Sequence, residues 1–184
     1  FNHVAGKLCI FRDVTVERDL EKQIRHSSNT DFLTGLYNRR CFYQYIHNNR
    51  GGRTVSLMYI DLDRFKEVND TYGHKVGDAV LVHTADVLRR LFRDDFVARL
   101  GGDEFLVVRL GKCSMDQMEQ EAEAFLKEMR TAFLAAEQTV SLSASVGIAQ
   151  SSDSMVDIDA LLQRSDQALY QAKKAGRSRY CVYR

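Results

Sequence analysis

The stretch Arg99–Phe105, Arg-Leu-Gly-Gly-Asp-Glu-Phe, constrains the fold more than any other part of the sequence. Apolar runs flank it at 96–98 and 105–108, and a Gly-Gly pair between two such runs predicts a β-hairpin. Glycine suits the turn because it accepts positive φ angles and lets another group approach the backbone closely. Asp103 and Glu104 then begin the return strand, where successive side chains point to opposite faces. One of them therefore shares a face with any site beneath the hairpin. Read alone, Gly-Gly-Asp-Glu fits a solvated acidic turn equally well.

A second acidic element follows another apolar run. Val55–Ile60 is almost continuously apolar, which predicts a central strand buried on both faces. It leads directly into Asp61 and Asp63, and sheet proteins commonly place ligand sites where buried strands end. An EF-hand is excluded, because its loop needs further ligands, a central glycine and a final glutamate at fixed spacing. Lys66, a few residues on, suits an anionic ligand.

The two acidic elements point to a metal site if their strands are neighbours, because Asp61 and Glu104 then converge. Two carboxylates about 4 Å apart repel by about 4 kcal/mol at an effective dielectric near 20, so a proton or a cation must compensate. Oxygen ligands without His or Cys favour Mg²⁺, with Mn²⁺ as the second choice. A magnesium ion with few protein ligands implies that a phosphate-bearing substrate completes its shell. The predicted chemistry is metal-assisted attack on phosphorus.

Composition limits the class of protein. The chain has 184 residues, enough for one domain and a short extension, and its net charge of +1 gives no bulk attraction to nucleic acid or to an anionic membrane. No apolar run is long enough to cross a bilayer, and no signal-peptide pattern is present. The four cysteines lack metal-ligand spacing, which favours reduced thiols in a reducing compartment. We therefore expect a cytoplasmic protein.

The remaining elements follow from apolar periodicity and turn residues. Val140–Ile148 alternates apolar with small polar residues, which predicts a half-buried antiparallel strand. Asn69–Asp78 is interpreted as a polar loop that opens a helix. Leu91 and Ala132 are assigned to the inner faces of two helices. Helices are predicted over 39–47, 77–92, 115–133 and 157–175, and a final strand over 180–183.

The N-terminal segment is interpreted separately. Val4–Phe11 fits one strand, and a charged run over 16–26 fits a helix with a narrow apolar stripe. That stripe suits either a surface helix or, if the protein is a dimer, a short two-stranded coiled coil. The stretch resembles the end of a PAS sensor domain, where a last strand leads into a connecting helix. Because the chain starts at Phe1, we expect it to be a fragment of a longer protein.

Several motifs in one order resemble those of GGDEF domains, the diguanylate cyclases. The signature is Arg99–Phe105, and the resemblance covers about 31–183. The supporting motifs are Asp31…Leu33-Thr34-Gly35-Leu36…Asn38-Arg39-Arg40; Asp61-x-Asp63-x-Phe65-Lys66-x-x-Asn69-Asp70; Gly73-His74-x-x-Gly77-Asp78; and Asp166-x-Ala168-Leu169-Tyr170-x-Ala172-Lys173-x-x-Gly176-Arg177.

The resemblance implies a fold, a reaction and a domain division. The fold would be of the α+β class, a central mostly antiparallel sheet flanked by helices, similar to nucleotidyl cyclases and polymerase palm domains. Two subunits of a homodimer would each bind GTP and condense the two into cyclic di-GMP and two pyrophosphates, under control of an upstream sensor domain. Residues 1–13 would be a PAS-like remnant, 14–30 a connecting helix and 31–184 the GGDEF domain.

The resemblance also implies roles for individual residues. Glu104 and Asp103 would be catalytic, and together with Asp61 and the Leu62 carbonyl they would hold Mg²⁺. Asn69 and Asp78 would bind guanine, and Asp78 matches the form that selects GTP over ATP. The remaining substrate contacts would come from Lys66, Lys173, Arg177, the backbone amides of Arg64 and Phe65, and His74, with Gly101 and Gly102 letting the nucleotide lie against the hairpin. The general base stays open between a metal-bound hydroxide and a carboxylate.

One departure concerns the inhibitory product site, Arg-x-x-Asp, that many family members carry just before the signature. The equivalent stretch is Phe92-Arg93-Asp94-Asp95. Asp95 is in place, but Phe92 occupies the arginine position, and Arg93 would point differently. The sequence therefore predicts weak or absent product inhibition by this route. A non-catalytic module that binds GTP or cyclic di-GMP is the alternative function, and a pure dimerisation segment is a third.

Overall fold

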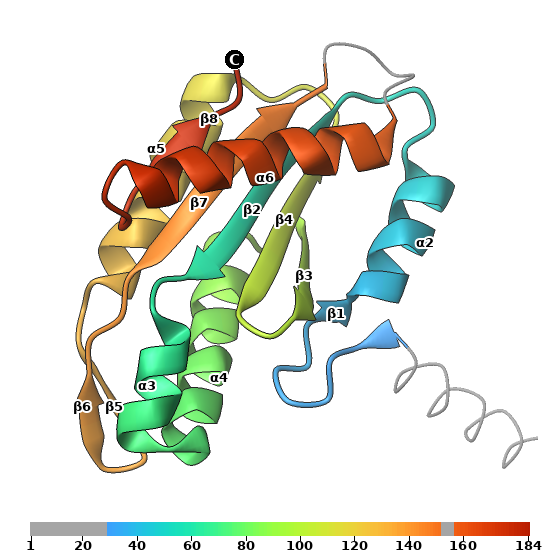
Figure 1. The fold of residues 1–184 in the computed structure, drawn as a ribbon. Coiled ribbons are helices and arrows are strands. Elements are labelled where there is room, and N and C mark those ends of the chain that lie inside the picture. Colours follow the sequence, from blue (N-terminus) through green and yellow to red (C-terminus); the bar gives the residue numbers. More distant parts are fainter. Residues whose placement is uncertain (1–28, 152–156) are drawn as a thin grey trace, which may run out of the picture.

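The computed structural model describes residues 29–151 and 157–184 (Figure 1). The predicted strand Val4–Phe11 and the charged helix that follows it lie outside the described residues.

Six strands form one mixed sheet within the described part of the chain, in the order β1-β3-β4-β2-β7-β8. β2 lies between β4 and β7 and is antiparallel to both, and β3 is antiparallel to β4. The two edge strands are parallel to their neighbours, β1 to β3 and β8 to β7. The predicted α+β class with a central, mostly antiparallel sheet is confirmed. The strands are β1 (Tyr37–Asn38), β2 (Val55–Leu62), β3 (Phe96–Gly101), β4 (Glu104–Leu110), β7 (Ala144–Gln150) and β8 (Tyr180–Val182), with a separate hairpin of β5 (Phe133–Ala135) and β6 (Gln138–Val140).

Helices cover both faces of the sheet (Figure 1). The helices are α2 (Arg39–Asn49), α3 (Phe65–Tyr72), α4 (His74–Leu91), α5 (Met115–Met129) and α6 (Ile158–Lys174). Apolar side chains of α2 and α6 pack on one face, and those of α4 and α5 form the larger core on the other. The short helix α3 follows β2 and packs beside α4.

The central strand β2 is buried on both faces, as its sequence predicts. Leu57 and Tyr59 belong to the core beneath α2 and α6, whereas Met58 and Ile60 belong to the core of α4 and α5. Because side chains alternate along a strand, Asp61 falls on the same face as Tyr59, the face that α6 covers. The strand thus places the Asp61 carboxylate beneath α6.

The prediction for Val140–Ile148 is wrong in two respects. The segment divides into β6 and β7, and β7 is buried on both faces rather than one. The small polar positions of the alternation, Ser145 and Gly147, lie under α6 instead of facing solvent. A Cβ on Gly147 would stand 2.0 Å from the Ser165 carbonyl oxygen, so the missing side chain is what lets α6 approach the sheet closely.

Three helix predictions also need correction. Asn69–Tyr72 belongs to α3 rather than to a loop, because Val68 packs into the core and holds the turn-favouring residues in a helix. Leu91 is 37% exposed, since Leu88 and Phe92 fill the core at the end of α4. α5 ends at Met129, which leaves Ala132 exposed before β5. In the described parts of the chain no helix is both long and apolar enough to cross a membrane.

Candidate active site

Strand pairing brings the two acidic elements together. In the β2–β4 ladder Asp61 and Glu104 are direct partners across the two strands. The Leu62 amide also donates to the Asp103 carbonyl oxygen at 3.3 Å, which fastens the end of β2 to the hairpin. The condition set by the sequence, that the two strands be neighbours, is met. We call Asp61, Asp103 and Glu104 the acidic edge.

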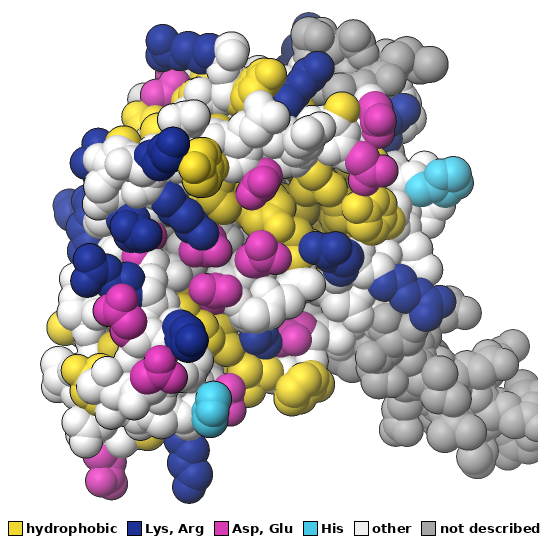
Figure 2. Space-filling view, viewed as in Figure 1, with side chains coloured by type: hydrophobic (Ala, Val, Ile, Leu, Met, Phe, Trp, Pro, Cys, Tyr) yellow, Lys and Arg dark blue, Asp and Glu magenta, His cyan; other side chains and the backbone are white. Residues whose placement is uncertain are grey.

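A lysine from α6 pairs with the acidic edge. Lys173 Nζ lies 2.8 Å from Asp61 Oδ1, and the two side chains are 33% and 14% exposed. The pKa of Asp61 is nevertheless raised, because burial and the charges of Asp103 and Glu104 outweigh the lysine. Figure 2 shows acidic side chains gathered on this face with lysine and arginine side chains on either side. The edge therefore carries more negative charge than its own lysine neutralises.

The donor chemistry of the edge suits a hard cation. Asp61, Asp103, Glu104 and the Leu62 carbonyl offer oxygen atoms, which Mg²⁺ prefers. Burial first, and then the charges of Asp103 and Glu104, raise the pKa of Asp61, so a cation would favour its charged form. The side chains do not form a closed cage, since no group of three or more His, Cys, Asp or Glu residues is arranged to hold a metal ion in 29–151 or 157–184. An open set of oxygens fits an ion that keeps water and substrate oxygens in its shell.

The hairpin turn is held by an arginine whose role the sequence analysis missed. Gly101 and Gly102 have φ angles of 147° and 52°, so the predicted need for glycine at this turn is confirmed. Arg99 is 9% exposed, and its Nε and Nη2 donate to the Gly102 carbonyl oxygen at 2.9 and 2.7 Å. Its Nη1 pairs with Asp31 Oδ1 at 2.9 Å. We call Arg99, Asp31, Thr34 and Gly102 the arginine clamp.

The loop that contains Asp31 forms the other half of the clamp. Asp31 Oδ1 accepts from the Thr34 amide at 2.8 Å and from Thr34 Oγ1 at 2.6 Å. Burial alone would raise the pKa of Asp31, but the bonds from Thr34 and the Arg99 guanidinium lower it below its ordinary value. Arg89 also donates to the Thr34 carbonyl oxygen. A charged residue at the end of an otherwise apolar strand was the signal in the sequence that could have identified Arg99.

Asp63 stands apart from the acidic edge, although only Leu62 separates it from Asp61. It is 4% exposed, and its carboxylate accepts hydrogen bonds from Ser143, Ser145 and Ser178. The two aspartates at the end of β2 therefore differ in role. Asp61 faces Lys173 and the hairpin, whereas Asp63 joins three segments of backbone.

The residues proposed to contact phosphate lie around the end of α6 and the start of α3. A cavity of about 480 Å³ between these elements is lined by Arg64, Arg177 and Asp63, among others. Arg64 and Arg177 both adopt left-handed backbone conformations, with φ of 58° and 63°. Lys66 is exposed on α3, and Phe65 begins that helix. Arg64 and Arg177 thus share a cavity with Asp63, which does not include the acidic edge, whereas Lys173 pairs with that edge directly.

The proposed guanine-binding residues lie on the helix pair α3 and α4. A Cβ on Gly77 would stand 1.9 Å from Asn69 Oδ1, so the Asn69 side chain lies directly over this glycine. Asp78 follows Gly77 and is exposed, and His74 is exposed at the first position of α4. An amide and a carboxylate thus occupy adjacent positions on two packed helices. The structure brings Asn69 and Asp78 to one end of this helix pair.

Tyr59 is a second residue that the sequence analysis did not identify. It is 8% exposed on β2, on the same face as Asp61. Burial raises its pKa, as do the charge of Glu104 and a hydrogen bond to that carboxylate. The Tyr59 side chain therefore faces a member of the acidic edge from inside the core.

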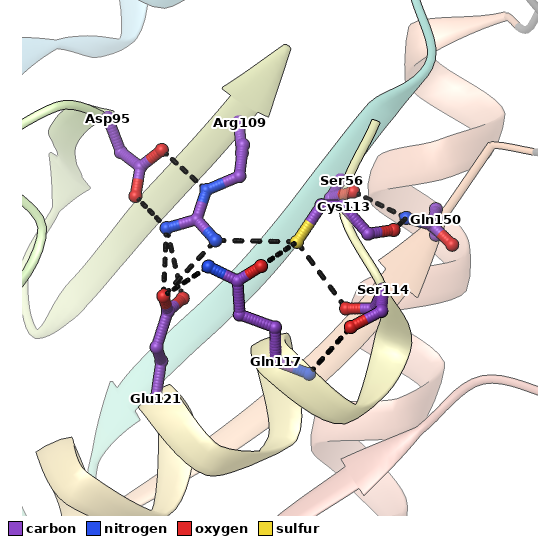
Figure 3. A network of polar contacts seen from close by, with 8 residues as sticks. All are labelled: Ser56, Asp95, Arg109, Cys113, Ser114, Gln117, Glu121 and Gln150. Carbon is purple, nitrogen blue, oxygen red and sulfur yellow. Dashed lines mark hydrogen bonds and ion pairs between the residues drawn. The ribbon is translucent and has the colours of Figure 1, made fainter. Parts of the chain in front are cut away.

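The remnant of the product site is occupied by an internal ion pair (Figure 3). Asp95 is 6% exposed, and Arg109 donates to both its oxygens, Nε to Oδ1 at 2.8 Å and Nη2 to Oδ2 at 2.5 Å. Arg109 also pairs with Glu121 at 3.0 Å, and the hydrogen bonds from Arg109 to Asp95 raise the pKa of the guanidinium. Arg93 is exposed and, together with Asp95, lines a cavity of about 360 Å³ beside Tyr37 and Tyr45.

Known proteins resemble this chain along most of its length. The family model "Diguanylate cyclase, GGDEF domain" matches residues 28–179. Two relatives from Escherichia coli K12 are the cyclic di-GMP phosphodiesterase PdeR, 38% identical over 180 residues, and the diguanylate cyclase DgcM, 37% identical over 178 residues. The alignments cover 96% and 94% of this chain but 27% and 42% of those proteins, so the chain spans less than half the length of either.

A solved structure agrees with the fold. The coiled coil and GGDEF domain of DgcB from Caulobacter crescentus, in complex with c-di-GMP, superposes with a TM-score of 0.85 at 28% identity. The match covers 92% of this chain and 93% of that one. The acidic edge, the glycine turn and the mixed sheet thus occur together in a chain that belongs to the GGDEF domain family of diguanylate cyclases.

Proposed function

We propose that the chain is a diguanylate cyclase that condenses two GTP molecules into cyclic di-GMP and two pyrophosphates. The observation that carries the proposal is the pairing of Asp61 with Glu104 next to Asp103, which leaves the acidic edge complete. Lys173 and the nearby arginines supply the positive charge that a triphosphate needs. The family match and the relatives named as diguanylate cyclases support this reading.

In the proposed reaction each ribose 3′-hydroxyl attacks the α-phosphorus of the other GTP. A new O3′–P bond forms, the bond to the pyrophosphate oxygen breaks, and the hydroxyl proton leaves to a base that stays unassigned. Asp61, the Leu62 carbonyl, Asp103 and Glu104 would hold Mg²⁺, or Mn²⁺ in its place, and this ion would supply charge stabilisation at the attacking and leaving oxygens.

Other residues of the chain bind and orient the substrate in this proposal. Asn69 and Asp78 would hydrogen-bond the guanine edge, with His74 nearby. Lys66, Lys173 and Arg177 would neutralise the phosphate oxygens, assisted by the amides of Arg64 and Phe65. Gly101 and Gly102 would leave room for the nucleotide against the hairpin.

Catalysis requires two substrates, so the proposed active form is a homodimer. We assign 31–184 to the catalytic domain, 14–30 to a connecting helix and 1–13 to the remnant of a PAS-like sensor. The domain would act in the bacterial cytoplasm under control of that upstream sensor. Product inhibition through Asp95 should be weak, because Arg109 already occupies its carboxylate. Tight cyclic di-GMP binding at Asp95 would contradict this.

The direct test is incubation of the purified chain at high concentration with GTP and Mg²⁺, followed by chromatography for cyclic di-GMP. We expect product, with a rate that rises faster than linearly with protein concentration. Glu104→Ala should lower the rate by at least about 100-fold, the effect typical of losing one charge-stabilising group. Asp116→Ala, which changes an exposed acidic residue in the first turn of α5, is the control and should keep the rate. Turnover by Glu104→Ala at the wild-type rate would contradict the metal assignment.

A non-catalytic module that binds GTP or cyclic di-GMP is the second candidate. The similarity to PdeR favours it, because that protein is named for breaking cyclic di-GMP and this chain spans 27% of it. Binding of GTP without product would support this reading. Forced dimerisation through residues 16–27 then separates the two, since a cyclase that lacks only its partner regains activity.

A further inference from the structure

We infer that Asp63 is a positioning residue for Arg177: its carboxylate fixes the turn from which the Arg177 side chain extends. The inference rests on the proposed function, in which Arg177 binds the triphosphate of GTP. It gives a role to the second aspartate of the Asp61-x-Asp63 motif, which the acidic edge does not use.

Asp63 ties three segments together at one buried point. Oδ2 accepts from Ser143 Oγ at 2.6 Å and from the Ser178 amide at 3.0 Å, and Oδ1 accepts from Ser145 Oγ at 2.7 Å. The Asp63 amide also donates to the Ser143 carbonyl oxygen at 2.8 Å. The end of β2, the start of β7 and the connection from α6 to β8 are therefore joined through a single side chain.

The connection held by Asp63 has an unusual backbone. Gly176, Arg177 and Ser178 have φ angles of 114°, 63° and 50°, so three successive residues lie at positive φ. Glycine tolerates this, but arginine and serine do so only where surrounding contacts hold them. The Ser178 amide that donates to Asp63 belongs to the peptide bond between Arg177 and Ser178. The Ser178 carbonyl oxygen is held from the other side by Arg130 Nη2 at 2.6 Å.

The alternative role for Asp63 is that of another metal ligand. Both its oxygens already accept hydrogen bonds, and the side chain is 4% exposed. Asp61, by contrast, pairs with a lysine and faces the hairpin. A buried carboxylate whose oxygens are satisfied by hydroxyl and amide donors acts as a structural acceptor. Asp63 and Arg177 line the same cavity, which places the support directly behind the group it orients.

The test compares nucleotides that differ in their phosphates. We would measure the binding of an α,β-methylene analogue of GTP and of GMP to the whole chain and to Asp63→Asn. The asparagine keeps the size of the side chain but loses one acceptor, which frees the turn. We expect about tenfold weaker binding of the triphosphate analogue and unchanged binding of GMP. Asp159→Asn, an exposed aspartate on α6, is the control and should bind both as the wild type does.

A double-mutant cycle separates positioning from a general loss of structure. Arg177→Ala should weaken triphosphate binding on its own, and adding Asp63→Asn to it should cause no further loss. Hydrogen exchange at the Ser178 amide gives a readout that does not involve nucleotide. It should be slow in the wild type and fast in Asp63→Asn, while amides in β2 and β7 stay protected.

The results that would overturn the inference differ from the result that would overturn the proposed function. If Arg177→Ala weakens triphosphate binding and Asp63→Asn does not, the inference is overturned and the proposed function stands. If Asp63→Asn weakens binding equally in the wild type and in Arg177→Ala, Asp63 acts by another route and the inference is again overturned. A wild-type chain that binds no guanine nucleotide overturns the proposed function itself, and with it the role of Arg177.

Discussion

The acidic edge and the arginine clamp lie at the same end of the sheet, but the pKa values of their aspartates shift in opposite directions. In the clamp, Asp31 is surrounded by donors, and hydrogen bonds from Thr34 and Arg99 lower its pKa despite burial. In the edge, burial and the neighbouring charges of Asp103 and Glu104 raise the pKa of Asp61 despite Lys173. The clamp is complete without a ligand, whereas the edge keeps an excess of negative charge that a cation would relieve.

Within this one hairpin, the residue that stabilises the turn is therefore a different one from the residue proposed to act in the site. Arg99 holds the turn from one side, and Glu104 presents its carboxylate two residues after Gly102. A rigid support next to an electrostatically unfavourable site is what preorganised chemistry requires, because the reacting groups cannot relax away from each other. Substitutions in the clamp should therefore cost stability, and substitutions in the edge should cost activity alone.

The largest effect should come from Arg99→Ala. The change leaves the Asp31 carboxylate, 16% exposed, without its cationic partner and removes both donors to the Gly102 carbonyl oxygen. We expect the free energy of unfolding, measured by urea denaturation, to fall by about 3 kcal/mol. Arg90→Ala breaks an exposed ion pair with Glu128 and should cost less than about 1 kcal/mol. Equal losses in the two variants would show that the clamp is an ordinary surface pair.

Gly147→Ala should come next, because it disturbs the edge from the side of α6. The new Cβ would meet backbone atoms, the Ser165 carbonyl oxygen at 2.0 Å and the Leu169 nitrogen at 2.3 Å, so the helix must move. We expect a loss of about 2–3 kcal/mol in the free energy of unfolding. The proposed cyclase activity should fall as well, because α6 carries Lys173.

Gly77→Ala is the matched substitution at the other end of the site. Its Cβ would meet the side-chain oxygen of Asn69 at 1.9 Å, and that side chain can rotate away. Stability should hold or rise, since alanine favours a helix by about 1 kcal/mol over glycine, while guanine binding weakens. A stable Gly147→Ala protein would mean that α6 is not packed as closely as the structure has it.

The smallest expected effect is an increase in stability, in the variant Asp61→Asn. Asp61→Asn removes a charge whose pKa is raised in the folded state, so ionisation of Asp61 costs the wild type stability as pH rises above the ordinary aspartate value of 3.8. Without metal at neutral pH, the Tm of the variant should rise by about 2 °C, although activity is lost. The gain should shrink as pH falls towards 3.8, where the wild-type carboxyl is also protonated.

The control for this prediction is Asp94→Asn, an exposed aspartate that should leave the Tm unchanged at every pH. A wild type more stable than Asp61→Asn at neutral pH would mean that Lys173 outweighs burial. The acidic edge would then resemble the clamp, and the comparison between them would fail.

Local sequence patterns predicted the elements that depend on near neighbours. The apolar run 55–60 predicted a strand buried on both faces, and Gly101-Gly102 predicted the hairpin turn, because alternation and positive φ are local properties. The patterns failed where distant segments decide burial. Val140–Ile148 reads as half-buried, but α6 covers its second face, and Asn69–Tyr72 reads as a loop until Val68 packs against the core.

The sequence by itself determined the chemistry that this protein carries: the carboxylates at two strand ends, the glycine turn, the basic residues at the end of the last helix, and the family they indicate. Only the tertiary structure decided which carboxylates share a site. It put Asp61 opposite Glu104, bound Asp63 to Ser143, Ser145 and Ser178, and paired Asp95 with Arg109. The physical reason is that spacing along the chain fixes the face on which a side chain emerges, whereas its partner is set by the segments that packing brings beside it.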